Sequence, residues 1–295
     1  MTPSQQILQY LVSGITNGSV YALIALGFVT IYSVTGIINF AQGEFVMLGA
    51  LITVSLFQAG LPLLGASLLS ILTVAVLASL LQWTAIRPAK GASILTLIII
   101  TIGAALTLRG IALVIWGTFP YALPPFTEGP PWRPFGIMVR LQSLWVLGTT
   151  LALQPLLHLF FHHTLVGKSL RACAINPFAA RLMGIDTQRM GLFSFAFSGA
   201  LAALGGILIT PIILATYDMG LMLALKGFVA AAMGGLGNYP IAVAGGFLLG
   251  ILESLGAGLI SSGYKDAIAF FILFLILLSR PHWIFRKEET SEGEA

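Results

Sequence analysis

Four ionisable residues interrupt long runs of apolar sequence: Glu44, Arg109, Lys226 and Glu253. On insertion scales, an ionisable side chain at the centre of a membrane helix costs about 2.5–3.5 kcal/mol, so such a residue is a candidate for function by default. One interpretation is that these side chains face an aqueous pathway. The other is that they pair inside a helical bundle, for example Glu44 with Lys226, and fix the registry of the helices. The sequence leaves both interpretations open.

Amide side chains accompany these charges. Asn39 and Gln42 precede Glu44 in a polar break between two apolar runs, and Asn17 lies inside the first run. An amide at such a place either binds a polar solute or caps a helix end and satisfies free backbone groups, and capping is the preferred interpretation for Asn39. The translocation-pathway candidates are Asn39, Gln42, Glu44, Lys226 and Glu253.

Two motifs that resemble chemical sites fail on their context. Gly167-Lys168-Ser169 matches the end of a phosphate-binding loop, but that pattern requires a preceding strand and a second glycine five residues earlier, where His162 stands. His158, His162 and His163 match one histidine box of the membrane di-iron oxygenases, which need several more histidines than the one that remains. No serine or cysteine nucleophile with a histidine partner follows from the spacing. We expect no enzyme activity, no metal and no cofactor bound by this chain.

The composition is typical of a membrane protein. Of the 295 residues, 58% are hydrophobic and only 8% are charged, whereas soluble domains carry about 25% charged residues. Lipid is therefore the expected solvent for most of the chain. The basic residues behind the net charge of +4 lie in short connections and at the C-terminus, so they do not indicate a nucleic-acid partner. The single cysteine, Cys173, excludes an internal disulfide.

Nine hydrophobic segments, separated by breaks rich in glycine and proline, make up most of the sequence. A spanning helix needs about 20 predominantly apolar residues. We therefore predict an all-α fold, a polytopic transmembrane helical bundle with eight or nine membrane segments. The seventh segment is short and contains Lys226 near its middle, so it is the one that need not cross. The segments lie near residues 9–34, 42–59, 62–86, 93–117, 139–161, 191–213, 221–235, 241–260 and 265–280.

The distribution of Lys and Arg orients the bundle, because cytoplasmic loops carry an excess of both. With nine crossings and the C-terminus in the cytoplasm, the N-terminus lies outside. The cytoplasmic side then holds Arg87, Lys90, Lys168, Arg171, Arg181, Arg189, Arg280, Arg286 and Lys287, and the outer side holds Arg133, Arg140 and Lys265. We expect one transmembrane domain over residues 1–287, with a proline-rich outer loop at 118–138 and a disordered cytoplasmic tail at 288–295.

The longest polar connection on the predicted cytoplasmic side covers residues 164–190. Asn176 is a helix-capping residue and Pro177 suits the first helical position, so a short basic helix is predicted to begin there and to end at Gly184. Such a helix, lying along the membrane face between two spans, is either a docking element for a soluble partner or an ordinary membrane-surface helix.

Glycine pairs predict close helix packing, since small residues four positions apart let backbones approach each other in lipid. Two such pairs are Gly14 with Gly18 and Gly246 with Gly250. A weak internal repeat is also indicated. Residues 43–49 and 226–234 share a glycine followed by a Phe-Val pair, and each stretch follows a long glycine-rich segment and a polar break.

Taken with their neighbours, these residues resemble the LivH-type permeases of branched-chain amino acid ABC importers. The similarity runs over nearly the whole chain, from about Leu11 to Phe285. Its most specific motifs are Ile38-Asn39-Phe40-Ala41-Gln42-Gly43-Glu44 and Met233-Gly234-Gly235-Leu236-Gly237-Asn238-Tyr239-Pro240. Further matches are Asn17-Gly18-Ser19-Val20-Tyr21-Ala22-Leu23, Arg171-Ala172-Cys173-Ala174, Gly184-Ile185-Asp186-Thr187, Gly250-Ile251-Leu252-Glu253 and Tyr264-Lys265-Asp266.

The resemblance implies an assembly and a mechanism. The expected partners are a second homologous permease subunit, two cytoplasmic ATP-binding subunits that hold ATP and Mg²⁺, and a periplasmic or other extracytoplasmic substrate-binding protein. The chain would lie in the cytoplasmic (inner) membrane of a bacterium or archaeon. It would move leucine, isoleucine and valine by alternating access driven by the partner ATPases. Urea and amide permeases share residues 39–44, so urea, an amide or another amino acid stays an alternative.

The resemblance also assigns roles within the cytoplasmic loop. Ala179-Ala180-x-x-x-Gly184 fits the core of the Glu-Ala-Ala coupling motif of ABC importers, although Phe178 stands at the glutamate position. The residues expected to couple the loop to an ATPase are Gly167, Arg171, Ala179, Ala180, Gly184 and Asp186. Two other classes stay open: an ion-coupled secondary transporter that uses Glu44 and Glu253, and a membrane enzyme built on the histidine cluster.

Overall fold

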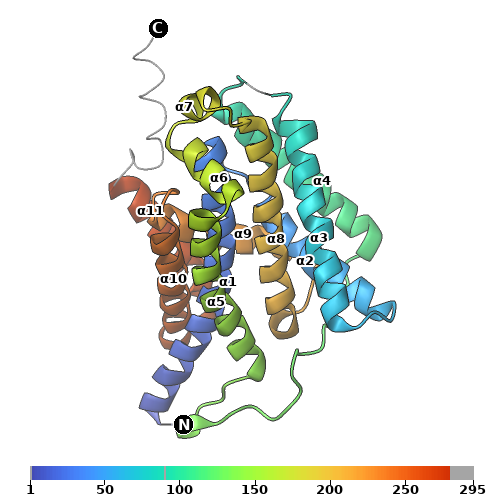
Figure 1. The fold of residues 1–295 in the computed structure, drawn as a ribbon. Coiled ribbons are helices and arrows are strands. Elements are labelled where there is room, and N and C mark those ends of the chain that lie inside the picture. Colours follow the sequence, from blue (N-terminus) through green and yellow to red (C-terminus); the bar gives the residue numbers. More distant parts are fainter. Residues whose placement is uncertain (1, 90, 280–295) are drawn as a thin grey trace.

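The computed structural model describes residues 2–89 and 91–279. In that part of the chain the regular elements are helices, with two isolated β-bridges, and the helices stand side by side in a bundle (Figure 1). The predicted all-α bundle is confirmed. Its α-helices are α1 (Pro3–Thr35), α2 (Gln42–Gln58), α3 (Leu63–Leu81), α4 (Ile94–Trp116), α5 (Leu141–His163), α6 (Leu165–Ile175), α7 (Pro177–Leu182), α8 (Thr187–Ile213), α9 (Met219–Met233), α10 (Tyr239–Leu259) and α11 (Lys265–Ser279).

Each of the nine predicted hydrophobic segments corresponds to a helix, namely α1 to α5 and α8 to α11. Six of these are long and apolar enough to cross a membrane: α1, α3 with its π-helical extension Gln82–Ile86, α4, α5, α8 and α10. The shorter apolar helices α2 and α9 have 17 and 15 residues, and α11 has 15. The chain is thus a multi-pass membrane protein. Lys90, Arg280, Arg286, Lys287 and the predicted tail at 288–295 lie outside the described residues.

Helix α1 forms the centre of the bundle, and every residue from Gly18 to Ile31 is buried. Helix α10 packs along α1 through the glycine pairs predicted for close approach. A Cβ atom added to Gly14 would lie 2.7 Å from the Cα of Ile251, and one added to Gly18 would lie 2.8 Å from the carbonyl oxygen of Gly246. The two backbones touch because no side chain separates them, so both glycine pairs belong to a single interface.

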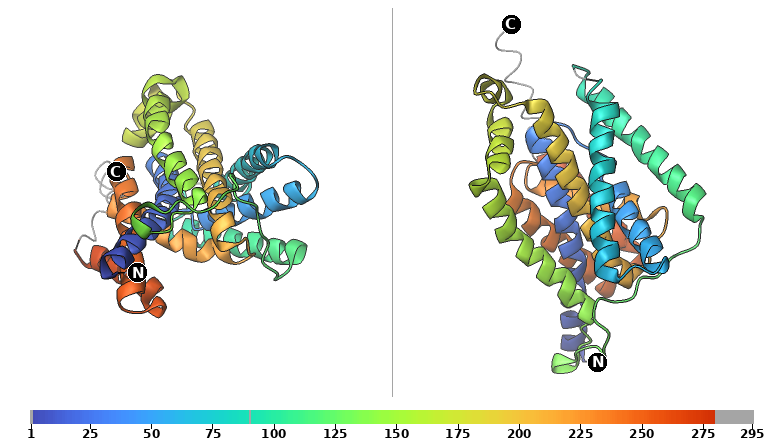
Figure 2. Two further views of the ribbon diagram at one scale, coloured as in Figure 1. Left: turned by 90° about the horizontal axis from the view of Figure 1, so that it is seen from below. Right: turned by 45° about the vertical axis from the view of Figure 1, so that its right-hand side comes forward.

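Two sets of connections mark opposite ends of the bundle (Figures 1 and 2). At one end the N-terminus lies beside the proline-rich segment 117–140. Tyr121 of that segment exchanges two backbone hydrogen bonds of 2.8 Å with Ala215, which follows α8. Gln9 of α1 bonds to the backbone of Met138 at 2.8 and 3.0 Å. The other end carries α6 and α7. The proline-rich segment and the α6–α7 pair therefore lie on opposite sides of the bundle.

Helices α1 and α8 run in opposite directions (Figure 1), and each is followed by a break and a short helix, α2 or α9. The first turns of the two short helices touch. A Cβ atom on Gly43 would lie 2.1 Å from the carbonyl oxygen of Gly220, and one on Gly220 would lie 2.5 Å from that of Gly43. These contacts do not test which residues of 43–49 and 226–234 correspond, so the internal repeat stays a prediction.

Candidate functional site

Helices α6 and α7 project from one end of the bundle and are called here the α6–α7 ledge (residues 165–182). The side chain of Asn176 caps α7 by accepting from the backbone N–H groups of Phe178 and Ala179, at 2.9 and 3.0 Å. Pro177 occupies the first helical position. The chain turns away at Gly184, whose φ of +81° is a conformation that residues with a side chain rarely take. The predicted short helix is confirmed.

A second short helix precedes it, which the sequence analysis did not predict. The hydroxyl of Thr164 caps α6 by accepting from the N–H of Gly167 at 3.0 Å. Helix α6 then folds back tightly on the end of α5, since a Cβ atom on Gly167 would lie only 2.1 Å from the carbonyl oxygen of Phe160. The sequence predicted one short helix in the loop at 164–190. The loop contains two, α6 and α7, and is largely helical.

The six residues predicted to couple this loop to a partner divide into two groups. Gly167 and Ala180 are buried against the bundle, so they shape the ledge from within. The exposed members are Arg171, Ala179, Gly184 and Asp186. Only the second group is positioned to touch another protein directly.

Asp186 begins α8 and is held by its own backbone neighbours. Its carboxylate accepts from the N–H groups of Gln188 and Arg189 at 2.9 and 3.2 Å, and it pairs with the Arg189 side chain at 3.1 Å. Hydrogen bonds to the charged form, that from the Arg189 backbone foremost, hold the pKa of the Asp186 carboxyl below its usual value. The cap fixes the direction in which the chain re-enters the bundle after the ledge.

Large apolar side chains stand uncovered on α7 and just after it. Phe178, Leu182 and Met183 are 68%, 74% and 82% exposed. Apolar side chains gathered on an exposed element of this kind mark a site of contact with another protein or with a membrane surface. The ledge therefore offers an apolar contact surface on a helix that also carries the exposed Arg181.

The amides of the Asn39–Gln42 break satisfy backbone groups and link helices. Asn39 is buried and its Oδ1 accepts from the N–H of Ala41 at 3.1 Å. It thus satisfies a backbone group just before α2, whose N-terminal cap residue is Ala41 and not Asn39. Gln42 joins α2 to α8: its Nε2 donates to the carbonyl oxygen of Ser198 at 3.3 Å, and its Oε1 accepts from the Ser198 hydroxyl at 2.8 Å. A Cβ atom on Gly27 would displace the Gln42 amide, so α1 contributes a glycine there.

Glu44 forms an ion pair with Arg109, which links α2 to α4. The example pair of Glu44 with Lys226 is wrong. Glu44 lies in the first turn of α2 and faces α4, whereas Lys226 lies two turns into α9 and faces α10 and α11. The more general expectation, pairing within the bundle, is confirmed for both residues. One carboxylate oxygen of Glu44 is buried without a hydrogen-bond partner in the described part of the chain.

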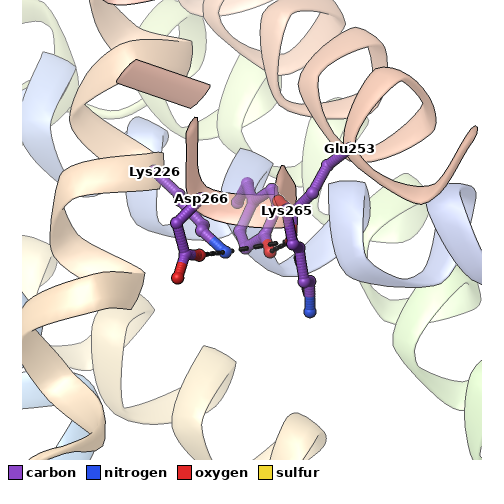
Figure 3. A network of polar contacts seen from close by, with 5 residues as sticks. Lys226, Glu253, Lys265 and Asp266 are labelled. Atoms are coloured by element: carbon purple, nitrogen blue, oxygen red, sulfur yellow. Dashed lines mark hydrogen bonds and ion pairs between the residues drawn. The ribbon is translucent and has the colours of Figure 1, made fainter. Parts of the chain in front are cut away.

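Lys226 is the centre of a network of four charges on three helices (Figure 3). Its Nζ lies 2.9 Å from Oε1 of Glu253 and 2.8 Å from Oδ1 of Asp266. The same Glu253 oxygen forms an ion pair with Nζ of Lys265 at 3.2 Å and accepts a hydrogen bond from the hydroxyl of Tyr21 at 3.2 Å. Two positive and two negative groups balance, which lowers the cost of holding Lys226 and Glu253 away from water.

Cavities enter the bundle from both ends. At the ledge end, one of about 830 Å³ is lined by residues that include Gln82, Arg87 and Arg181, and one of about 340 Å³ is lined by residues that include His158 and Arg171. At the end of the 117–140 segment, a cavity of about 270 Å³ borders Lys226 and Lys265. The histidine cluster is part of a cavity wall, and the described residues contain no group of three or more metal-ligating side chains.

Sequence reasoning missed three partners that complete these contacts: Ser198, Tyr21 and Asp266. Ser198 lies in an apolar run where a single hydroxyl gives little signal. Tyr21 and Asp266 both stand in motifs shared with the permeases, but a motif names no partner. Asp266 follows Lys265 at the start of a hydrophobic segment, and this charged pair at a helix start is the signal from which a network could have been predicted.

Comparisons with known protein families and with individual relatives agree with one another and with the helical membrane fold. A family model described as the branched-chain amino acid transport system / permease component matches residues 10–277. The chain is 32% identical to the high-affinity branched-chain amino acid transport system permease protein LivH of Escherichia coli (strain K12), over 97% of each chain. It is 31% identical to the corresponding protein BraD of Pseudomonas aeruginosa, over 97% of each chain. Identity to a probable LivH of Methanocaldococcus jannaschii is 30%, over 92% of this chain and 90% of that one. On these matches and on its fold, the chain belongs to the family of branched-chain amino acid transport permeases.

Proposed function

We propose that this chain is the permease subunit of an ATP-driven importer that carries leucine, isoleucine and valine across the cytoplasmic membrane. Family membership over residues 10–277 supports the transport role. The names of the relatives in Escherichia coli and Pseudomonas aeruginosa support branched-chain amino acids as the cargo. A permease contributes differential contacts in two conformational states and no catalytic step, so the chain is not an enzyme and binds no cofactor in this proposal.

The observation that carries the proposal is the α6–α7 ledge. A chain of this family needs an external energy source. The ledge is a short capped helix pair that carries the exposed apolar side chains of Phe178 and Leu182, with Met183 exposed just after it. A nucleotide-binding subunit would dock on this surface. In the complete assembly we expect two such subunits, a second permease and an extracytoplasmic binding protein.

Charge supports placing the ledge in the cytoplasm. Arg87 and Arg181 line one cavity at the ledge end, and Arg171 lines another, while the segment at the opposite end carries Arg133 and Arg140. Cytoplasmic connections are enriched in Lys and Arg. The N-terminus then lies outside, and the C-terminus lies in the cytoplasm.

Alternating access requires that two sides of the bundle open in turn. Cavities reach α1 from both ends, at Val34 and Thr35 on the ledge side and at Val20 and Tyr21 on the other, and residues 22–31 of α1, which lie between them, are buried. Asn39 bonds to the backbone just before α2, Gln42 and Glu44 hold α2 against α8 and α4, and Lys226 with Glu253 holds α9 against α10. In this proposal those contacts line or border the pathway and are exchanged as the subunit changes state.

The test compares two phenylalanines at opposite ends of the molecule in the complete importer. Phe178 on the ledge is 68% exposed, and Phe119 in the 117–140 segment is 78% exposed. Phe178→Asp is expected to remove co-purification with the ATP-binding subunit and to abolish uptake of labelled leucine. Phe119→Asp is expected to leave co-purification unchanged. Retained ATPase binding in Phe178→Asp would contradict the docking role of the ledge.

A further inference from the structure

The cavity of about 270 Å³ lies beside the charge network, between α1, α9, the end of α8 and the start of α11. It faces the end of the molecule that carries the 117–140 segment. Leu214 and Thr216, which line it, flank Ala215, and Ala215 is the residue that pairs with Tyr121. Its volume falls just below the range of about 300–1,000 Å³ found for drug-sized ligands, so it suits a small metabolite.

One wall of this cavity is apolar and is built from branched or flexible side chains. Its members are Val20, Ile209, Ile213, Leu214, Met219, Met222 and Leu223. Methionine adapts its shape to the group it contacts, and aliphatic walls favour aliphatic ligands through burial of apolar surface. This wall suits a short aliphatic side chain. Its side chains offer no strong hydrogen-bonding groups to a small polar molecule such as urea.

The other wall is polar and carries hydrogen-bond donors. A lysine ammonium has three N–H donors. Lys226 directs two of them to Glu253 and Asp266, and Lys265 directs one to Glu253. In the described part of the chain these contacts use three of the six N–H donors of the two lysines that line the cavity, and Asn17 adds an amide on the α1 side. That set of donors matches the two oxygens of a carboxylate.

Water has access to this wall. Helix α10 continues from Glu253 to Leu259, which carries it about 9 Å further along its axis. Even so, Lys265 and Asp266 beside Glu253 are 44% and 49% exposed. Charged side chains exposed to this extent are solvated by water and not by lipid, so water reaches the polar wall from this end of the bundle. That end lies on the side from which an importer receives its substrate.

We propose that this cavity is an outward-facing subsite for an aliphatic α-amino acid. The ligand carboxylate binds Lys226 and Lys265, its ammonium group faces the Asn17 amide oxygen, and its side chain packs against Ile213 and Met222. The balanced network becomes a receptor for a zwitterion, since a ligand with one charge of each sign leaves the balance unchanged. The inference rests on the proposed importer function and assigns its cargo a binding site in this chain.

The test uses the complete importer in nanodiscs, without nucleotide, and measures binding of labelled leucine. Met222 and Leu221 are adjacent on α9 and both are 44% exposed, but only Met222 lines the cavity. Met222→Trp fills the space and is expected to weaken leucine binding by about tenfold or more, whereas Leu221→Trp is expected to stay within about twofold of wild type. Neither substitution touches the charge network, so folding is preserved, and thermal stability of both variants checks this.

A ligand series tests the polar wall in the unmodified importer. Leucinamide, which lacks the carboxylate, is expected to compete with labelled leucine about tenfold or more weakly than leucine itself. Lys265→Gln is expected to remove most of that discrimination. Wild-type binding in Met222→Trp, or equal competition by leucinamide and leucine, would overturn the subsite while leaving leucine uptake and the proposed function intact. Absence of leucine uptake by the wild-type importer would overturn both.

Discussion

The interior of the bundle and the α6–α7 ledge hold their charged residues in opposite ways. In the interior, Glu44, Lys226 and Glu253 are almost completely buried, and each is paired with a side chain from a different helix. On the ledge side, Arg181 bonds to the hydroxyl of Thr187 at 2.9 Å and Asp186 bonds to the backbone that follows it. Interior charges thus fix how helices sit against one another. The charges at the ledge bond to residues close to them in the sequence, which leaves the outer surface of α7 available to a partner.

The interior itself contains two kinds of pairing. Glu44 and Arg109 form an isolated pair, whereas Glu253 has Lys226, Lys265 and Tyr21 around one oxygen. The loss of one member should therefore be severe for the pair and milder for the network, because the remaining members of the network still compensate the charge.

The largest loss of folding stability is expected for Arg109→Met. The substitution leaves the carboxylate of Glu44 buried without its cation, and breaking a buried pair in this way typically costs about 3–5 kcal/mol. The thermal unfolding midpoint in detergent should fall steeply, or the folded fraction should disappear. The double variant Glu44→Gln/Arg109→Met removes both charges and should recover most of the loss. A stable Arg109→Met chain would show that α4 does not depend on this contact.

A smaller effect is expected for Lys226→Met. Glu253 keeps Lys265 and Tyr21 as donors, so the expected loss of stability is about 1–3 kcal/mol, the cost of removing one hydrogen-bond partner from a buried group. The same detergent unfolding assay measures it, with Arg109→Met as the reference. If Lys226→Met were the more destabilising of the two, the distinction between an isolated pair and a compensated network would be lost.

The smallest effect is expected at Asp186, on the ledge side of the comparison. Its folded-state pKa lies below its unfolded value, so its capping contribution is present at neutral pH and is lost as pH falls through the folded pKa. Hydrogen–deuterium exchange of a peptide covering residues 184–190, corrected for intrinsic rates, should show protection at pH 7 that decreases below about pH 4. Asp186→Ala should remove the pH dependence. If the wild type were equally protected at pH 7 and below about pH 4, the Asp186 cap would not stabilise the start of α8.

The sequence predicted the helices well because their signals are local. Apolar runs located all nine hydrophobic helices, and the capping residue Asn176 with Pro177 and Gly184 located α7. Helix α6 was missed although Thr164 caps it, because a run that contains Gly167, Lys168 and Arg171 resembles a polar connection.

The partners of the buried charges were not predictable in the same way. Glu44 pairs with Arg109, which is 65 residues away in the sequence, and not with Lys226. Opposite charge alone would allow Glu44 to pair with either Arg109 or Lys226. The packing of α4 against α2 places Arg109, and not Lys226, beside Glu44. The cavity beside Lys226 is likewise made by four helices together, so no single segment of sequence contains it.

The central claim is that the α6–α7 ledge lies in the cytoplasm, where an ATP-binding subunit can reach it. Ala179 is exposed on α7, and Cys173, the one native cysteine, is buried. A Cys173→Ala/Ala179→Cys chain therefore carries a single accessible thiol for a membrane-impermeant maleimide. We predict labelling in inside-out vesicles, protection by bound ATPase subunits, and no labelling in right-side-out vesicles. Labelling from the outer side of intact cells would contradict the account.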